Sequence, residues 1–204
     1  MAKNTYDRII KISTKLMSMY GFYGTSLQMI SEKVGISKST IVHHFTSKEG
    51  LLIAILNENL PLTINNLTPI VNDEHVNGTE KLNRFIHYHL NQLEKRWDIM
   101  NLFLMQSKFL DNYSRTKFAK MQCDYWKLVE QIVIQIQKEK SGFEKLDPKI
   151  VSIGIIGMLT WVGLWYRKNG KHSITSIAET FYRIITNPVI NTQVSEHIDE
   201  IYKF

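Results

Sequence analysis

The sequence predicts an all-α fold. Apolar residues recur three and four positions apart along most of the 204 residues, which is the spacing of one face of a helix. Serine, threonine or aspartate precedes several of these stretches as a helix cap, and glycine or proline ends or interrupts them. No stretch alternates apolar and polar residues over the length of a strand. The chain is therefore predicted to consist of helices joined by short connections.

The composition is ordinary for a soluble globular protein, with 22% charged and 44% hydrophobic residues. The formal net charge is +6, and the first 50 residues hold seven basic residues against three acidic ones, an excess of +4. Such an excess suits contact with a nucleic-acid backbone, although alone it also fits a solvated face. Cys123 has no second cysteine to pair with, so a reducing, cytoplasmic setting is expected.

The N-terminal residues are expected to form an amphipathic helix rather than a secretory signal. The residues expected on its buried side are Ile9, Ile10, Leu16, Met17 and Tyr20. This helix is predicted to brace two shorter helices that follow it.

The first short helix lies between residues 25 and 35. Thr25 or Ser26 is predicted to cap it, and Gly35 is predicted to end it, because glycine adopts the left-handed backbone that terminates helices. The apolar stripe on its buried face is Leu27, Ile30 and Val34.

The second short helix begins after Ser37, its predicted cap, and turns Ile41 and Phe45 towards the core. Its outward face is short, polar and basic, and consists of Ser37, Lys38, Ser39, Thr40, Val42, His43 and His44. Thr46 or Ser47 is the predicted cap of the next helix, with Lys48 in its first turn. Two helices joined by a glycine turn, the second with a hydrogen-bonding exposed face, form the layout of a helix-turn-helix.

The same stretch resembles the N-terminal domain of the TetR family of bacterial transcriptional regulators. The residues that carry the resemblance are Gly21, Phe22, Thr25, Ser26, Ile30, Gly35, Ile36, Ser37, His44, Phe45, Ser47, Lys48, Glu49 and Leu51. Val42 departs from the family pattern, which usually has a phosphate-contacting Tyr there, but a valine can pack on a thymine methyl.

The resemblance implies a three-helix head that binds double-stranded operator DNA, followed by a helical body that dimerises and holds a small-molecule effector. The expected domains are residues 1–50 and residues 51–204. The residues expected to contact DNA are Thr25, Ser26, Ser37, Lys38, Ser39, Thr40, Val42, His43, His44 and Lys48. A homodimer is also expected because a single short recognition helix reads too few base pairs.

The body is predicted to contain further helices. A fourth helix from Leu51 links head and body, and a loop or irregular helix with Pro61 and Pro69 follows between Asn57 and Asn77. The next predicted helix starts after a cap at Thr79, a second runs from about Trp97 to Leu110, and a third runs from Ser114 to near Gly142. A fourth starts at Asp147 and Pro148, and a fifth starts after a cap at Ser173 and ends at Asn187 and Pro188. One further short helix is predicted in the tail after Pro188.

Residues 150–166 contain no charged side chain. Seventeen such residues reach the lower limit for a membrane span, so a membrane-anchored helical protein is one alternative. Burial on all sides is the favoured interpretation, with no membrane partner. In the TetR-like architecture the last two main helices pair with their copies, and the residues expected at that dimer interface are Gly154, Gly157, Met158, Ile177, Phe181 and Ile184.

An effector pocket is expected where methionines and flat aromatic side chains gather, since these suit an apolar guest. Its expected residues are Trp97, Met100, Phe103, Met105, Phe109, Tyr125, Trp126, Trp161 and Trp165. No metal site, no cofactor and no enzyme motif is expected, because His87, His89 and Cys123 lack ligand spacing and no phosphate loop, nucleophile elbow or dinucleotide fingerprint occurs.

The expected function is that of a ligand-responsive DNA-binding transcriptional regulator, a repressor that releases a palindromic operator when a small lipophilic effector binds. A second alternative is a protein-interaction module of helix-turn-helix shape that has lost operator binding.

Overall fold

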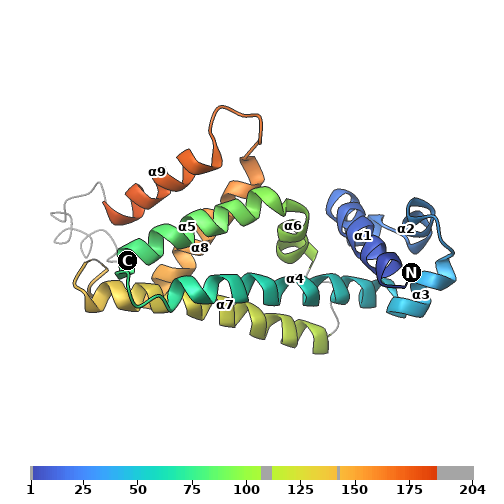
Figure 1. Cartoon of the computed structure of the whole chain (residues 1–204), viewed down its shortest axis with the longest axis horizontal. Helices are drawn as coiled ribbons and strands as arrows, with labels where there is room; N and C mark the ends of the chain where they lie inside the picture. The colour runs from blue at the N-terminus through green and yellow to red at the C-terminus, as the bar shows by residue number, and fades with distance from the viewer. Residues whose placement is uncertain (1, 107–111, 142, 188–204) are drawn as a thin grey trace, which may run out of the picture.

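The computed structural model describes residues 2–106, 112–141 and 143–187, and in this part of the chain every regular element is a helix. The all-α prediction is confirmed. Three helices form a head at one end, five form a body, and the long helix α4, Lys48–Val71, extends from the head along the length of the body (Figure 1).

The head consists of α1, Ala2–Gly24, α2, Leu27–Val34, and α3, Lys38–Phe45. The side chain of Ser26 caps α2, Ser37 caps α3 and Ser47 caps α4, each by accepting a backbone N–H three residues on. Gly35 ends α2 in the left-handed conformation, at φ 76°, as predicted.

The end of α1 differs from the prediction. Gly21 has φ 73° and interrupts the helix, so the chain turns before Phe22. Phe22 is therefore buried, whereas Tyr20, which was expected on the buried side, is 54% exposed. The period of the apolar residues did not reveal the kink because a glycine fits inside a helix at modest cost.

Helix α4 continues through Pro61 and Pro69, so the connection expected between Asn57 and Asn77 shortens to residues 72–77. Each proline removes one backbone donor from the helix. Around Pro61, Asn59 donates to the Ile55 carbonyl at 2.6 Å and Thr63 to the Asn59 carbonyl at 3.2 Å, which adds side-chain hydrogen bonds to the interrupted ladder. Because α4 packs between other body helices, tertiary packing outweighs the local preference of proline.

The body helices are α5, Gly78–Lys95, α6, Trp97–Gln106, α7, Asn112–Lys138, α8, Pro148–Trp165, and α9, Ile174–Thr186. Asp147 and Ser173 cap α8 and α9 as predicted, but the cap of α5 is Asn77 and not Thr79. The sequence allows this shift because an asparagine two residues earlier reaches the N–H of Glu80. The predicted tail helix after Pro188 lies outside the described residues.

Two hydrophobic cores match the two parts of the molecule. The body core gathers residues of α4, α5, α7, α8 and α9, among them Leu67, Phe85, Val129 and Leu159. The head core also draws on residues beyond position 50, namely Leu51, Leu52, Ile55 and Leu56 of α4, Leu102 of α6 and Phe118 of α7. Residues of α4 therefore pack in both cores, and the helix connects the head to the body.

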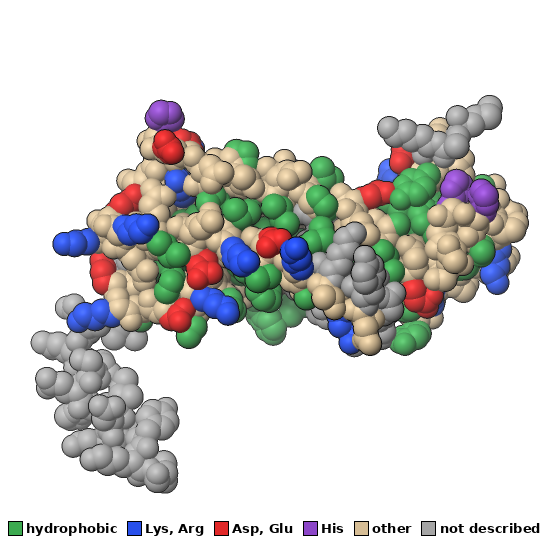
Figure 2. All heavy atoms as spheres, turned by 90° about the horizontal axis from the view of Figure 1, so that it is seen from below, with side chains coloured by type: hydrophobic (Ala, Val, Ile, Leu, Met, Phe, Trp, Pro, Cys, Tyr) green, Lys and Arg blue, Asp and Glu red, His purple; other side chains and the backbone are tan. Residues whose placement is uncertain are grey.

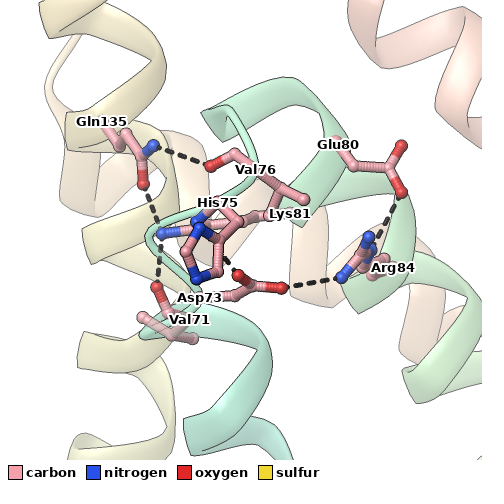
Figure 3. Close-up of polar contacts among 8 residues, drawn as sticks. All are labelled: Val71, Asp73, His75, Val76, Glu80, Lys81, Arg84 and Gln135. Atoms are coloured by element: carbon pink, nitrogen blue, oxygen red, sulfur yellow. Dashed lines mark hydrogen bonds and ion pairs between the residues drawn. The ribbon is translucent and has the colours of Figure 1, made fainter.

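The C-terminal end of α4 is held by Lys81 of α5, whose side chain is buried (Figure 3). The ammonium donates to the Val71 carbonyl at 2.6 Å and to the Gln135 side-chain oxygen of α7 at 2.7 Å. A cation is favourable at this position because the carbonyl end of a helix is partially negative. One side chain thus ties the last residue of α4 to two neighbouring helices.

Candidate DNA interface and effector cavity

Helix α3 presents the polar face that the sequence predicted. Lys38, Ser39, His43 and His44 are exposed, and Thr40 is half-buried. Histidine side chains project from the head end of the molecule in Figure 2. No acidic residue occurs between Lys33 and Lys48, so this surface is basic or neutral throughout.

Val42 lies among these polar side chains and is 40% exposed. An apolar side chain that extends from the middle of an otherwise polar helix face is available for contact with a thymine methyl group. Ser37, unlike Val42, is engaged within its own helix, because its hydroxyl accepts a hydrogen bond from the Thr40 N–H at 3.1 Å. Its role in α3 is therefore that of the cap, with the hydroxyls of Ser39 and Thr40 at 2.7 and 2.8 Å.

Three polar side chains of the head serve its internal structure. Thr25 is buried and donates to the Gly21 carbonyl, and Arg8 donates to the Val34 carbonyl at 2.6 Å, at the end of α2. Lys48 donates to the carbonyls of Phe22 and Thr25 at 2.8 and 2.9 Å, with its nitrogen 4.4 Å from the centre of the Phe22 ring. An ammonium has three donors, and Lys48 uses two of them for these carbonyls within the head.

The body contains a cavity of about 100 Å³ between α4, α5, α6, α7 and α8. Its lining is mostly apolar, and none of the described residues around it is Asp, Glu, Lys or Arg. The lining residues are Thr63, Tyr88, His89, Gln92, Met100, Phe118, Gln122, Tyr125, Trp126, Ile156 and Thr160. A charged group enclosed there would lack a counter-charge, which is costly, so the cavity suits a neutral guest.

His89 is the buried polar centre of this cavity. Its Nδ1 lies 2.7 Å from the Tyr125 hydroxyl, and its Nε2 lies 3.4 Å from the Thr160 hydroxyl. Burial lowers the pKa of His89 to about 4 and raises that of Tyr125, so both side chains are uncharged near neutral pH. The cavity wall thus offers hydrogen bonds without charge.

Two family models match the sequence. Residues 9–55 match the model described as bacterial regulatory proteins, tetR family, and residues 75–189 match the model described as tetracyclin repressor-like, C-terminal domain. The second match alone covers more than half of the chain. The chain belongs to the TetR family of bacterial regulatory proteins.

Similar proteins agree with this assignment over nearly the whole chain. The HTH-type transcriptional repressor KstR2 of Mycolicibacterium smegmatis is 21% identical over 193 residues, which cover 94% of this chain and 93% of the relative. The structure of AibR with isovaleryl coenzyme A and operator DNA has a TM-score of 0.82 at 22% identity, covering 89% of this chain and 98% of AibR. The fatty acid degradation regulator FadR from Bacillus halodurans has a TM-score of 0.76 at 20% identity, covering 91% of this chain and 96% of FadR.

As a TetR-family member, the chain is a DNA-binding transcriptional regulator, and the family acts as dimers. The family favours neither the interaction module nor the membrane-anchored protein that the sequence left open. By length and composition α8 is the one helix in the described residues that could cross a membrane, with 28% of its residues buried. Its buried residues pack towards α5 and α7, as in a body helix.

The residues expected at the dimer interface divide between two environments. Gly154 and Gly157 are exposed, and no atom lies within 4 Å of the position that an added Cβ would take, while Ile184 is 48% exposed. Ile177 and Phe181 pack against the body core instead. Apolar side chains also reach the surface of the body on the face that Figure 2 shows.

Three of the residues expected in the effector pocket line the cavity, namely Met100, Tyr125 and Trp126. Trp97 lies against α8, and Trp161 and Trp165 are exposed on α8. Phe109 and the side chains of Phe103 and Met105 lie outside the described residues. Sequence reasoning missed the polar part of the lining, although a histidine within the apolar stripe of α5 was a visible signal.

Proposed function

We propose that this protein is a dimeric repressor whose operator affinity falls when the body binds a short acyl compound in thioester form. The observation that carries the proposal is the uncharged cavity around His89, which touches the helix that joins the body to the DNA-binding head. We propose that it works in the cytoplasm as a regulator and has no catalytic role.

The chemistry of the lining supports a neutral acyl group. A free carboxylate would enter the cavity without a cation, whereas a thioester carbonyl needs only the neutral hydrogen-bond donors that His89, Tyr125 and Thr160 provide. A cavity of about 100 Å³ is two thirds of the 150 Å³ that holds the six carbons of a benzene ring, so roughly four to five carbon atoms fit. The relatives include a regulator solved with isovaleryl coenzyme A and a regulator of fatty acid degradation.

The coupling between cavity and head runs along α4. Thr63 of α4 lines the cavity, and its carbonyl accepts a 3.0 Å hydrogen bond from the Tyr88 hydroxyl of α5. One end of α4 packs in the head core, and the other end is held by Lys81. A guest that displaces Thr63 tilts α4 about its fixed end and changes the spacing of the two heads on DNA.

Half-sites for a twofold dimer must lie about one helical turn of DNA apart, roughly 34 to 36 Å, so a small tilt suffices to weaken binding. A coupling energy of roughly 1 to 3 kcal/mol corresponds to a loss of DNA affinity of about 5-fold to 150-fold.

The test has two steps. Purified protein first selects bound fragments from sheared DNA of the source organism at near-physiological salt, and sequencing is expected to return a short inverted repeat. Fluorescence anisotropy on that repeat is then measured with butyryl, isovaleryl, hexanoyl and palmitoyl coenzyme A. Release by the short thioesters and little effect of palmitoyl coenzyme A is the expected result. If no thioester changes the DNA affinity, the proposed function is wrong.

A further inference from the structure

A second hollow of about 280 Å³, the basic groove, lies beside the cavity on the same helices. Its lining residues are Leu93, Glu94, Trp97, Gly163, Tyr166, Arg167 and Lys168. On three helices, a groove residue lies about one turn from a residue that lines the cavity. These pairs are Leu93 and His89 in α5, Trp97 and Met100 in α6, and Gly163 and Thr160 in α8.

Trp97 forms part of the wall of the groove and packs on α8. A Cβ added to Gly163 would lie 2.0 Å from Cζ3 of the Trp97 ring, so the indole rests directly on the backbone of α8. Only glycine permits this approach. Trp97 lines the groove and Met100 lines the cavity, so the two hollows lie about one turn apart along α6.

The two hollows differ in charge. Arg167 and Lys168 line the groove, and Lys171 and His172 follow within four residues, all of them exposed. Among the described residues, no ion pair involves any of these four side chains. Glu94, the acidic residue of the groove, accepts a 2.5 Å hydrogen bond from the Tyr166 hydroxyl. The outer end of the groove is therefore positively charged and has cations available for an anion.

We propose that the basic groove binds the phosphate-bearing end of the effector, a coenzyme A type carrier, while the acyl end lies beyond Trp97 in the uncharged cavity. This inference rests on the proposed function. Thr160 lies five residues, or roughly 7 to 8 Å along the helix axis, before Trp165 at the end of α8, and Arg167 follows two residues later in the chain. An uncharged carrier arm spans that interval, and guanidinium and ammonium groups are suited to the phosphates beyond it.

The test compares isovaleryl coenzyme A with S-isovaleryl pantetheine, which has the same acyl group and arm but no phosphate, and with free isovalerate. Dissociation constants are measured by calorimetry for the wild type and for the double variant Arg167→Gln, Lys168→Gln. The matched control is Lys149→Gln, an exposed lysine in the first turn of α8, at the opposite end of that helix.

We expect the wild type to bind the coenzyme A thioester at least tenfold more tightly than the pantetheine thioester. The double variant should lose that preference and keep its pantetheine affinity, and Lys149→Gln should change neither. Equal affinity of the two thioesters in the wild type, or an equal loss in the Lys149→Gln control, would overturn the proposal. A loss confined to free isovalerate would assign the groove to a carboxylate and also contradict it.

A failure of the proposed function gives a different pattern. In that case neither thioester binds or changes the affinity for DNA. Binding of both thioesters with equal affinity, together with release of DNA, would uphold the proposed function and reject the basic groove as a phosphate site.

Discussion

The buried ammonium of Lys81 donates a 2.6 Å hydrogen bond to the carbonyl of Val71, the last residue of α4 (Figure 3). The same ammonium reaches Gln135 of α7, whose amide donates onward to Glu139 at 2.7 Å. The far end of the helix that enters the head is therefore fixed by a small polar network rather than by apolar packing alone.

Replacement of Lys81 by Met is expected to lower the free energy of unfolding by about 1 to 3 kcal/mol, because the Val71 and Gln135 oxygens lose a buried donor. Urea denaturation measures the change. Arg84→Gln is the control, since Arg84 makes only exposed ion pairs with Asp73 and Glu80 nearby and should change stability little. An equal effect of both substitutions would show that the Lys81 network does not hold α4.

His89 predicts a specific dependence of stability on pH. The folded pKa of about 4 lies below the unfolded value of 6.5, so between these values the unfolded chain binds a proton that the folded chain does not. The contribution of neutral His89 to the free energy of unfolding is complete above pH 6.5, and it falls by roughly 3 kcal/mol as the pH drops towards 4. We expect His89→Gln to remove this component, as measured by thermal unfolding at pH 7 and pH 4.5. A loss of stability on acidification that is the same in the variant would contradict the assignment.

Lys48 is expected to act in both stability and DNA binding. Lys48→Ala removes two hydrogen bonds to the carbonyls of Phe22 and Thr25, which should cost about 1 to 3 kcal/mol of stability. It should also lower the slope of log affinity against log salt by about one unit, through loss of a phosphate contact. Lys38→Ala, at an exposed position, should lower the slope alone. An unchanged slope in Lys48→Ala would leave Lys48 a purely internal role.

The glycines of α8 are expected to respond in opposite ways to alanine. Gly163→Ala forces Trp97 away from α8, so it should destabilise the subunit. Gly157→Ala meets no atom of the described residues within 4 Å and should slightly favour the helix within one subunit, yet weaken the dimer if a partner helix approaches there. Thermal unfolding and sedimentation velocity measure these two effects. A stable dimer in Gly157→Ala would place the close subunit contact elsewhere.

The sequence alone determined the head and the class of the fold. Caps and turns are local, so Ser37, Gly35 and Asp147 could be assigned from a few neighbouring residues, and the ordered motif from Gly21 to Leu51 identified the family. The outward face of α3 followed from the helical period, because the two buried positions, Ile41 and Phe45, leave the remaining ones outward.

Tertiary structure decided what depends on residues far apart in the chain. The continuity of α4 through Pro61 follows from packing on both sides, and the position of Trp97 on Gly163 follows from the crossing of α6 and α8. The cavity is lined from five helices, so no local pattern could distinguish Tyr125, which lines it, from Trp161, which is exposed. A helical period shows that a face is apolar, but only the arrangement of the helices shows whether that face meets a core, a cavity or a second subunit.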